Sequence, residues 1–87
     1  MANNVLIVSP RDNVAMALAP IPAGGAVTGA GLSLTARADI PKNHKVAIAA
    51  IPANQPVIKY GEPIGLARAD IAPGDWVHTQ NLKGEGE

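Results

Sequence analysis

The chain has 87 residues, no cysteine, and seven basic against seven acidic residues. This length allows one small domain. The lack of cysteine excludes a disulfide framework, a thiolate zinc site and thiol redox chemistry. The balanced charge gives no electrostatic case for binding nucleic acid or an anionic membrane. No apolar run approaches the length of a membrane span or of a signal peptide's apolar region, so we expect a cytoplasmic protein.

The first part of the chain predicts two short strands. Residues 4–8 are rich in β-branched side chains and end at a Ser-Pro pair, which is typical of a strand followed by a turn over residues 11–13. In residues 13–21, larger apolar side chains alternate with alanine. This period of two, followed by Pro20 and Pro22, favours a second strand over a short helix.

A nine-residue pattern of the form A-x-I-P-x-G-x-x-V then organises most of the chain. The Gly or Asn two positions after the proline occupies a site that needs a left-handed backbone. In the fourth copy the proline moves one place, to Pro73 before Gly74, which suits a type II turn. We expect each copy to form a strand, a tight turn and a second strand. The four copies are residues 19–27, 38–46, 49–57 and 69–77.

The four copies pair into two halves, residues 19–46 and residues 49–77, offset by 30 to 31 positions. Such a duplication predicts two similar lobes related by a pseudo-twofold axis. Eight prolines and nine glycines disfavour long helices. The predicted fold class is therefore all-β, with short strands and at most one helical turn. We expect residues 1–82 to form the domain and residues 83–87 a flexible tail.

Two histidines are candidates for chemistry. His78 and Asn81 follow Trp76-Val77 at a strand end, where a general base or a metal ligand can lie, although a polar strand end is the commoner explanation. His44-Lys45 falls in the turn of the second copy. A solvated turn explains Lys45, but no local structural need calls for an imidazole at position 44. The 33 residues between the histidines do not by spacing alone indicate a metal site.

Other polar groups have both a functional and a structural interpretation. Lys59 and Tyr60 can supply an anion-binding ammonium and a hydrogen-bonding hydroxyl, or Tyr60 can close the small core. Asp12-Asn13 before a strand is a common turn signature. No nucleophile–base pattern and no glycine-rich nucleotide motif is present. From the residues alone, the chain is a small β domain with polar clusters at its turns.

The ordered motifs resemble those of the SAF domain of the altronate/galactarate dehydratase family. The resemblance extends from about residue 7 to residue 82, and it implies a β-clip fold. In that family the domain is fused to a much larger catalytic domain or forms a separate small subunit, as in sulfolactate sulfo-lyase. The motifs are Asp12-Asn13-Val14-Ala15, Ile40-Pro41-x-x-His44-Lys45-Val46-Ala47, Val57-Ile58-Lys59-Tyr60-Gly61, Ile64-Gly65 and Asp70-Ile71-x-x-Gly74-x-x-Val77-His78-Thr79-x-Asn81-Leu82.

The resemblance implies elimination of water or sulfite from a small 2-hydroxy acid, with a divalent metal (iron, manganese or magnesium) in the holoenzyme. A metal stabilises the enolate-like charge formed when a proton is lost beside a carboxylate. The chain is then a small subunit or N-terminal domain that needs a large catalytic lyase subunit and is inactive alone. The implied site residues are His44, Lys45 and His78 for catalysis, Asp12, Asn13, Lys59, Tyr60 and Asn81 for substrate binding, and His44 and His78 for metal.

The chain departs from the family pattern at two positions, where Ser9 and Gln80 replace histidines. Asn43 also replaces a glycine before His44, a mild change because Asn tolerates a left-handed backbone. The two missing imidazoles give weight to an alternative. SAF domains also occur in sialic acid synthase, in type III antifreeze proteins and in pilus or flagellar assembly proteins. The alternative is therefore a non-catalytic binding module or a structural unit that self-associates into a homo-oligomer.

Overall fold

A computed structural model describes residues 3–84, and this part of the chain contains nine short strands and no helix. The all-β prediction is therefore confirmed. No segment within residues 3–84 forms a helix able to cross a membrane. The strands are β1 (Val5–Leu6), β2 (Val14–Ala17), β3 (Ala26–Gly29), β4 (Leu32–Thr35), β5 (Lys45–Ala47), β6 (Pro56–Lys59), β7 (Glu62–Ala67), β8 (Trp76–Val77) and β9 (Leu82–Gly84).

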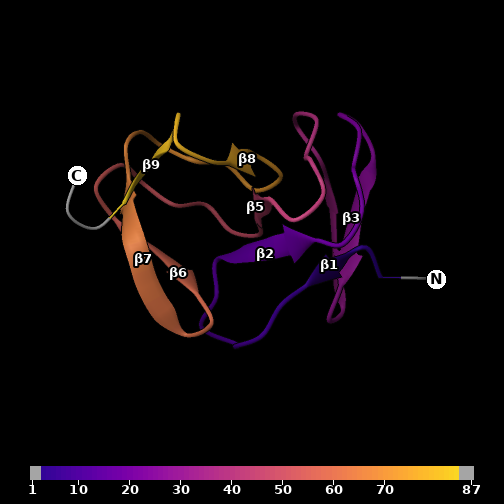
Figure 1. The fold of residues 1–87 in the computed structure, drawn as a ribbon, viewed down its shortest axis with the longest axis horizontal. Coiled ribbons are helices and arrows are strands. Elements are labelled where there is room, and N and C mark those ends of the chain that lie inside the picture. The colour runs from indigo at the N-terminus through magenta and orange to yellow at the C-terminus, as the bar shows by residue number, and fades with distance from the viewer. Residues whose placement is uncertain (1–2, 85–87) are drawn as a thin grey trace.

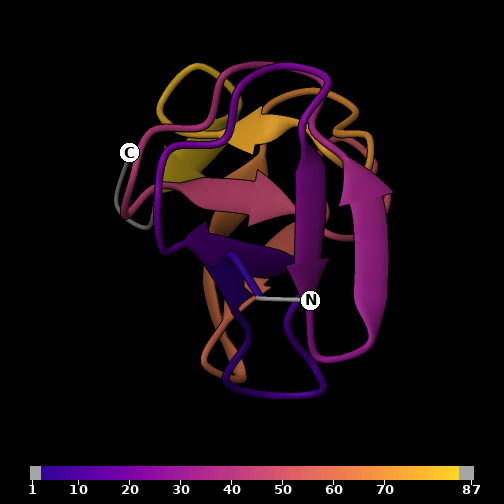
Figure 2. The same ribbon diagram turned by 90° about the vertical axis from the view of Figure 1, so that its right-hand side faces the viewer.

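The strands form three antiparallel sheets. The central sheet has the order β1-β2-β5-β8, and it is accompanied by the β3–β4 hairpin and by a β6-β7-β9 sheet. In Figure 1 the β3 strand lies on one side of the central sheet and β6 and β7 lie on the other. Figure 2 shows the β3–β4 hairpin in front of the central strands, which run across it. The central sheet is thus covered on each face by a different hairpin.

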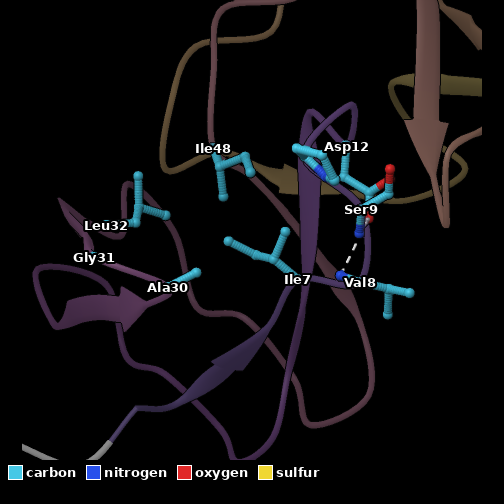
Figure 3. Close-up of a pocket in the computed structure, with 9 residues that line it drawn as sticks. Ile7, Val8, Ser9, Asp12, Ala30, Gly31, Leu32 and Ile48 are labelled. Carbon is cyan, nitrogen blue, oxygen red and sulfur yellow. Dashed lines mark hydrogen bonds between the residues drawn. The ribbon is translucent and has the colours of Figure 1, made fainter.

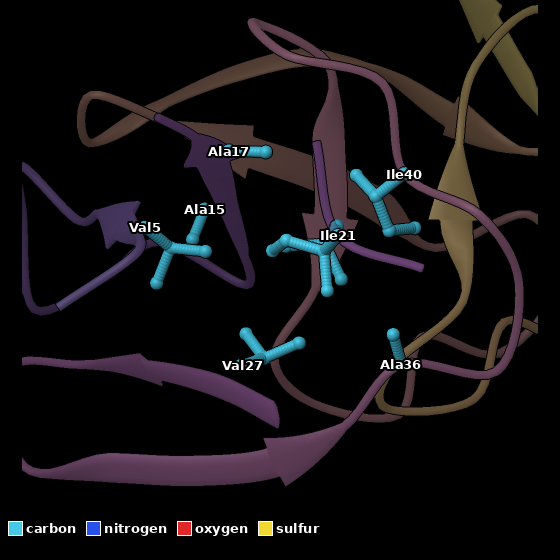
Figure 4. Packing of buried hydrophobic residues seen from close by; sticks show 8 residues of the cluster. Val5, Ala15, Ala17, Ile21, Val27, Ala36 and Ile40 are labelled. Carbon is cyan, nitrogen blue, oxygen red and sulfur yellow. The ribbon is translucent and has the colours of Figure 1, made fainter. Parts of the chain in front are cut away.

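Each face of the central sheet carries its own hydrophobic core, and consecutive residues of β2 and β5 divide between them. Val46 belongs to the first core and Ala47 to the second. Figure 4 shows Val5 of the first core beside Ala15 of β2. The first core is Val5, Ala15, Ala17, Ile21, Val27, Ala36, Ile40 and Val46. The second core is Val14, Ala47, Ile51, Val57, Ala67, Ile71 and Val77.

The two cores confirm the predicted duplication. Ile21 and Val27 of the first core correspond to Ile51 and Val57 of the second, 30 positions later, and Ile40 corresponds to Ile71, 31 positions later. Six of the first-core residues have such a partner in the second core; the remaining pairs are Ala17 with Ala47, Ala36 with Ala67, and Val46 with Val77. The two halves therefore share one packing scheme on opposite faces of the sheet.

The four predicted tight turns are present, and each is of type II. The residue expected to be left-handed has φ of 84° at Gly24, 69° at Asn43, 69° at Asn54 and 92° at Gly74. In each turn the next N–H donates to the carbonyl three residues earlier, at 2.8 to 3.1 Å. The left-handed N–H itself donates to the carbonyl of a buried alanine. These alanines are Ala36, Ala17, Ala67 and Ala47 in the same order.

The prediction of a strand before each turn is wrong. The residues there make only single antiparallel bridges, between Ile21 and Ile40 and between Ile51 and Ile71. Three of these isoleucines precede a proline, which has no N–H to continue a ladder, so the pairing ends after one residue. In each half an aspartate instead accepts a hydrogen bond from the backbone of the preceding turn. Both aspartates belong to the pentapeptide A-R-A-D-I, which occurs at residues 36–40 and 67–71. Asp39 Oδ1 accepts from the N–H of Ala23, and Asp70 Oδ1 from the N–H of Ala53, both at 2.9 Å.

The two hairpins are also duplicated. In each, both turn residues are left-handed, as type I′ turns require. The turn residues are Ala30-Gly31 between β3 and β4, and Tyr60-Gly61 between β6 and β7.

The end of the described chain is a strand where a flexible tail was expected. Lys83 and Gly84 belong to β9, which pairs with Gly65 and Leu66 of β7. Gly65 allows this approach, since a Cβ there would overlap the carbonyl of Lys83. The remaining tail positions, 85–87, lie outside the described residues.

Candidate functional site

The structure brings His44 and His78 together beside Trp76. β5 and β8 are neighbours, with Val46 paired to Trp76, so the end of one unit lies beside the end of another. His44 directly precedes β5, at the end of its type II turn, and His78 directly follows β8. Trp76 packs partly buried against the first core. We call His44, Trp76 and His78 the imidazole–indole cluster.

The three rings of the cluster touch one another. The indole of Trp76 stacks on the ring of His78, with an interplanar angle of 7° and centroids 5.4 Å apart. The two imidazoles lie 4.7 Å apart between centroids. Trp76 Nε1–H donates a hydrogen bond of 3.1 Å to Nδ1 of His44. All three side chains are half-buried, so they form part of the surface.

The turn after β8 holds the cluster in place. Asn81 Oδ1 accepts from the N–H of His78 at 3.0 Å, and its Nδ2 donates to the carbonyl of Trp76 at 2.9 Å. Gln80 Nε2 donates to the same carbonyl at 3.0 Å. The side-chain oxygen and nitrogen of Asn81 therefore both bond to the backbone. Asn81 thus fixes the backbone that carries Trp76 and His78.

Lys45 and Lys59 form a second group, on the other face. Lys45 pairs with Val77 of the second core, whereas Trp76 pairs with Val46 of the first, so Lys45 and Trp76 lie on opposite faces. Partial burial, and to a smaller extent the positive charge of Lys59, lower the pKa of Lys45. The structure thus separates Lys45 from the imidazoles although it follows His44 in sequence.

Tyr60 lies in the type I′ turn next to Lys59, and its side chain is 51% exposed. The ammonium of Lys59 is 4.4 Å from the centroid of its ring. The alternative that Tyr60 closes the core is wrong, because Tyr60 is half exposed and belongs to neither core. Its aromatic ring instead makes a cation–π contact with the Lys59 ammonium.

Asp12 joins the N-terminal loop to the β6–β7 hairpin. Its Oδ1 accepts from the N–H of Gly61 at 2.7 Å, and its Oδ2 accepts from the N–H of Ser9 at 3.2 Å. Burial raises the pKa of this carboxyl, but backbone N–H groups of Gly61, Ser9, Tyr60 and Val8 together outweigh burial and hold the pKa below its ordinary value. The carboxylate of Asp12 therefore stabilises the contact between the N-terminal loop and the β6–β7 hairpin.

Asn13 joins the same loop to β6. Its Nδ2 donates to the carbonyl of Pro56 at 3.0 Å, and its Oδ1 accepts from the N–H of Ile58 at 2.7 Å. Both ends of the amide are engaged, as they are in Asn81.

An open hollow of about 570 Å³ lies beside Ser9, between the N-terminal loop and the tip of the β3–β4 hairpin (Figure 3). Its walls are mostly apolar, with Ile7, Leu32 and Ile48 facing inward. Ser9 Oγ accepts from the N–H of Arg11 at 3.2 Å. This hollow contains none of the three rings of the cluster.

Comparison with known proteins decides the family. A model of the "Altronate/galactarate dehydratase SAF domain" matches residues 3–85, nearly the whole chain. The chain belongs to this SAF-domain family. The fold is all-β with several small antiparallel sheets, which is consistent with the β-clip expected from the resemblance.

The curated relatives of this SAF domain are mostly much longer proteins. It is 40% identical over 73 residues to altronate dehydratase of Bacillus subtilis (strain 168), covering 84% of the chain and 15% of that enzyme. It is 46% identical over 72 residues to altronate dehydratase of Escherichia coli (strain K12), covering 83% of the chain and 14% of that enzyme. The chain thus spans about one seventh of the length of these enzymes.

A third relative is close to this SAF domain in size. The (2R)-sulfolactate sulfo-lyase subunit alpha of Paracoccus pantotrophus is 54% identical over 50 residues, which cover 58% of the chain and 75% of that subunit. A domain of this kind therefore occurs both within a long enzyme and as most of a short subunit.

The described side chains of this SAF domain do not form a complete site for a divalent metal. Among residues 3–84, no group of three or more His, Cys, Asp or Glu side chains lies close enough to hold a metal ion. His44 and His78 are adjacent, but Nδ1 of His44 is engaged by Trp76. Magnesium and manganese prefer several oxygen ligands, and the cluster supplies imidazole nitrogens.

Sequence reasoning singled out both histidines but missed the role of Trp76 and of Gln80. Trp76 stood out only as the single tryptophan, since its contact with His44 spans 32 positions. Gln80 was noted as a missing histidine, and in the structure its amide holds the carbonyl of Trp76. Asn4 was not considered, although the dipeptide Asn-Val occurs at both 4–5 and 13–14 and was a usable signal.

Proposed function

We propose that this chain is the SAF part of a lyase that eliminates water or sulfite from a small 2-hydroxy acid together with a larger catalytic part. The relatives support this proposal, because they are two altronate dehydratases and a sulfolactate sulfo-lyase subunit. The match to most of a short subunit suggests association with a separate large subunit, and the match to one seventh of a long enzyme suggests fusion. A cytoplasmic location is the matching expectation.

The imidazole–indole cluster is the part of the chain that we place at the shared active site. The observation that carries this assignment is the contact of His44 with His78, two imidazoles brought together from different repeat units at the surface. Neither is needed by the duplicated scaffold, because the residues at the corresponding positions are Asp75 and Ala47. Residues that appear in only one of two duplicated positions are not explained by the fold, and such residues are candidates for a functional site.

The cluster suits binding and proton transfer to a hydroxy acid. Neutral imidazoles donate and accept hydrogen bonds, and they are the commonest general acid–base groups near neutral pH. Half-burial leaves one side of each ring open for the larger part to cover, which would exclude water from the bound acid. We place Lys45 and Lys59 outside this site because Lys45 lies on the opposite face of the sheet.

We further propose that the larger part holds the divalent metal, whether iron, manganese or magnesium. The described chain lacks the necessary group of ligands. When bound, such a metal would supply charge stabilisation to the intermediate formed beside the carboxylate. The SAF part would contribute the imidazoles that contact the substrate.

An exchange experiment tests the proposed function. The 73-residue segment of the Bacillus subtilis altronate dehydratase that matches this chain would be replaced by the chain, and the Paracoccus pantotrophus subunit alpha would be replaced in parallel. We expect elimination activity in at least one exchanged enzyme, well above that of the same enzyme lacking its SAF part. Activity no higher than in the deleted enzymes, despite correct assembly, would refute the proposal.

The alternative is a non-catalytic binding module or a self-associating structural unit. The local bonds of Ser9 and Gln80 favour it, because both residues replace imidazoles expected from the family pattern and both are satisfied by nearby backbone. Light scattering of the purified chain, alone and mixed with each large part, distinguishes the lyase proposal from this alternative. A stable homo-oligomer that does not combine with either large part would support the alternative.

A further inference from the structure

The hydrogen bond between Trp76 and His44 determines where the proton of the neutral imidazole lies. An indole N–H is a donor only, so the ring nitrogen that faces it must be an unprotonated acceptor. Trp76 Nε1 lies 3.1 Å from Nδ1 of His44. Neutral His44 therefore carries its proton on Nε2.

The proton on Nε2 is available to a ligand. Within the described part of the chain no buried side-chain nitrogen or oxygen lacks a hydrogen-bond partner, and Nε2 of His44 makes no bond to residues 3–84. This atom is therefore open to solvent. A fixed N–H donor at the surface is suited to an anionic oxygen, such as that of a carboxylate or of an enolate-like intermediate.

The indole is held more firmly than its partial exposure suggests. β8 pairs Trp76 with Val46, and the indole packs against the first core and stacks on His78. The carbonyl of Trp76 accepts hydrogen bonds from Gln80 and from Asn81. The donor direction is thus set by the backbone, the core and a second ring.

The fold itself does not require a tryptophan at this position. The corresponding residue of the other half is Lys45, 31 positions earlier, which occupies the same place after an equivalent turn. The scaffold accepts a lysine there, with a buried valine next in sequence in both cases. The indole therefore serves something specific to the second half, where its N–H donates to His44.

We propose that Trp76 is a positioning residue, which fixes His44 as the Nε2–H tautomer and orients that N–H toward a carboxylate or enolate oxygen of the bound hydroxy acid. The tautomer rests on the hydrogen bond alone, and the use of the donor rests on the proposed function. For metal-ligating histidines, losing the partner that fixes tautomer and orientation typically costs about 10- to 100-fold in metal affinity or activity, and we expect an effect of this size here.

The tautomer is tested without any enzyme assay. Long-range ¹H–¹⁵N correlation spectra of the full chain in alkaline buffer distinguish a protonated from an unprotonated ring nitrogen at each position. We expect an unprotonated Nδ1 and a protonated Nε2 at His44. Trp76→Phe keeps a ring but removes the donor and should produce a mixture of tautomers. Lys83→Gln, at an exposed position of β9, leaves the hydrogen bonds of Trp76 in place and should not. A mixture in the unsubstituted chain would overturn the inference.

The role in catalysis is tested in an exchanged lyase that carries this chain. Trp76→Phe should lower kcat/KM by about 10- to 100-fold, and the control Lys83→Gln much less. If Trp76→Phe fails to fold, Trp76→Lys takes its place, because the corresponding residue is Lys45. Full activity in the Trp76 variants, with an active unsubstituted exchange, would overturn the positioning role alone. No activity in the unsubstituted exchange would remove the proposed function and the catalytic role with it, while the tautomer result would stand.

Discussion

Asn4 and Asn13 make the same set of hydrogen bonds, each to the hairpin of a different half of the domain. Each side-chain Nδ2 donates to a carbonyl at the start of a hairpin, and each Oδ1 accepts from the N–H two residues later. The partners are Ala26 and Thr28 for Asn4, and Pro56 and Ile58 for Asn13. The partners differ by 30 positions, so the duplication of the two halves includes the asparagines that attach the N-terminal segment.

This correspondence predicts that Asn13 acts in stability and not in substrate binding. Asn13→Ala removes two hydrogen bonds to backbone groups of β6 and should lower the free energy of unfolding by about 1–3 kcal/mol. Asn4→Ala is the matched control and should cost a similar amount. Urea denaturation of both variants measures this. An Asn13→Ala chain as stable as the unsubstituted chain, with weaker substrate binding in the holoenzyme, would contradict the structural role.

The stability of the fold should fall at acid pH because of Asp12. The pKa of Asp12 in the folded chain lies below the ordinary value of 3.8. The ionised carboxylate therefore contributes stability that is complete above about pH 5 and is lost as the pH falls through the lowered pKa. Asp12→Asn should lower the free energy of unfolding at neutral pH by about 1–3 kcal/mol, because one of the two acceptor oxygens becomes an NH2 group and the charge that strengthens the remaining bonds is lost.

Thermal unfolding between neutral and acid pH checks this. The difference between the unsubstituted chain and Asp12→Asn should shrink as the pH falls below the ordinary value of the aspartate pKa. A difference that stays constant across this range would mean that the charge of Asp12 is not what stabilises the loop.

Lys59 disfavours the protonated form of Lys45, because the two positive charges repel each other. Burial and Lys59 lower the pKa of Lys45, so Lys59→Gln should raise that pKa toward its ordinary value. Because a lysine with a lowered pKa destabilises the fold while it is protonated, the same substitution should stabilise the chain slightly at neutral pH, by less than about 1 kcal/mol for partly exposed charges. An NMR titration of the lysine side chains measures the pKa. Lys83→Gln is the control, since Lys83 makes no contribution to the shift.

The turn that contains Gly74 should be the more sensitive to substitution of its left-handed residue. Gly74 has φ of 92°, and a Cβ there would overlap the carbonyl of Thr35. Gly74→Ala should therefore destabilise the chain by more than about 1 kcal/mol. Asn43→Gly, at φ of 69° in the corresponding turn of the other half, should change stability by only a few tenths of a kcal/mol. Equal effects in chemical denaturation would show that the two turns do not differ as the structure indicates.

The sequence predicted those features that depend on neighbouring residues. Gly24, Asn43, Asn54 and Gly74 were each identified as left-handed from a proline and a repeat, because turn geometry is determined over four positions. The duplication followed from the same pattern. Strand lengths were overestimated, since alternation of apolar residues does not show where pairing ends, and β1 covers only two of the five expected positions.

The site was less accessible from the sequence because its contacts join distant positions. The bond from Asp12 to Gly61 spans 49 positions, and that from Trp76 to His44 spans 32. Asp12 was therefore interpreted as a local turn residue. The proximity of His44 and His78 depends on the pairing of β5 with β8, which the repeat pattern does not specify.

The central claim is that this SAF domain brings His44 and His78 to the active site of a larger lyase. The most direct measurement is kcat/KM for water elimination from altronate by the exchanged Bacillus subtilis enzyme, with His44→Ala, His78→Ala and, as a control on the opposite face, Lys45→Ala. We predict that the unsubstituted exchange is active and that each histidine variant loses at least about 100-fold, as expected for a donor to an anionic oxygen at His44 and for a general acid–base group at His78. We predict that Lys45→Ala loses far less. Histidine variants as active as the unsubstituted exchange, in correctly assembled enzyme, would contradict the claim.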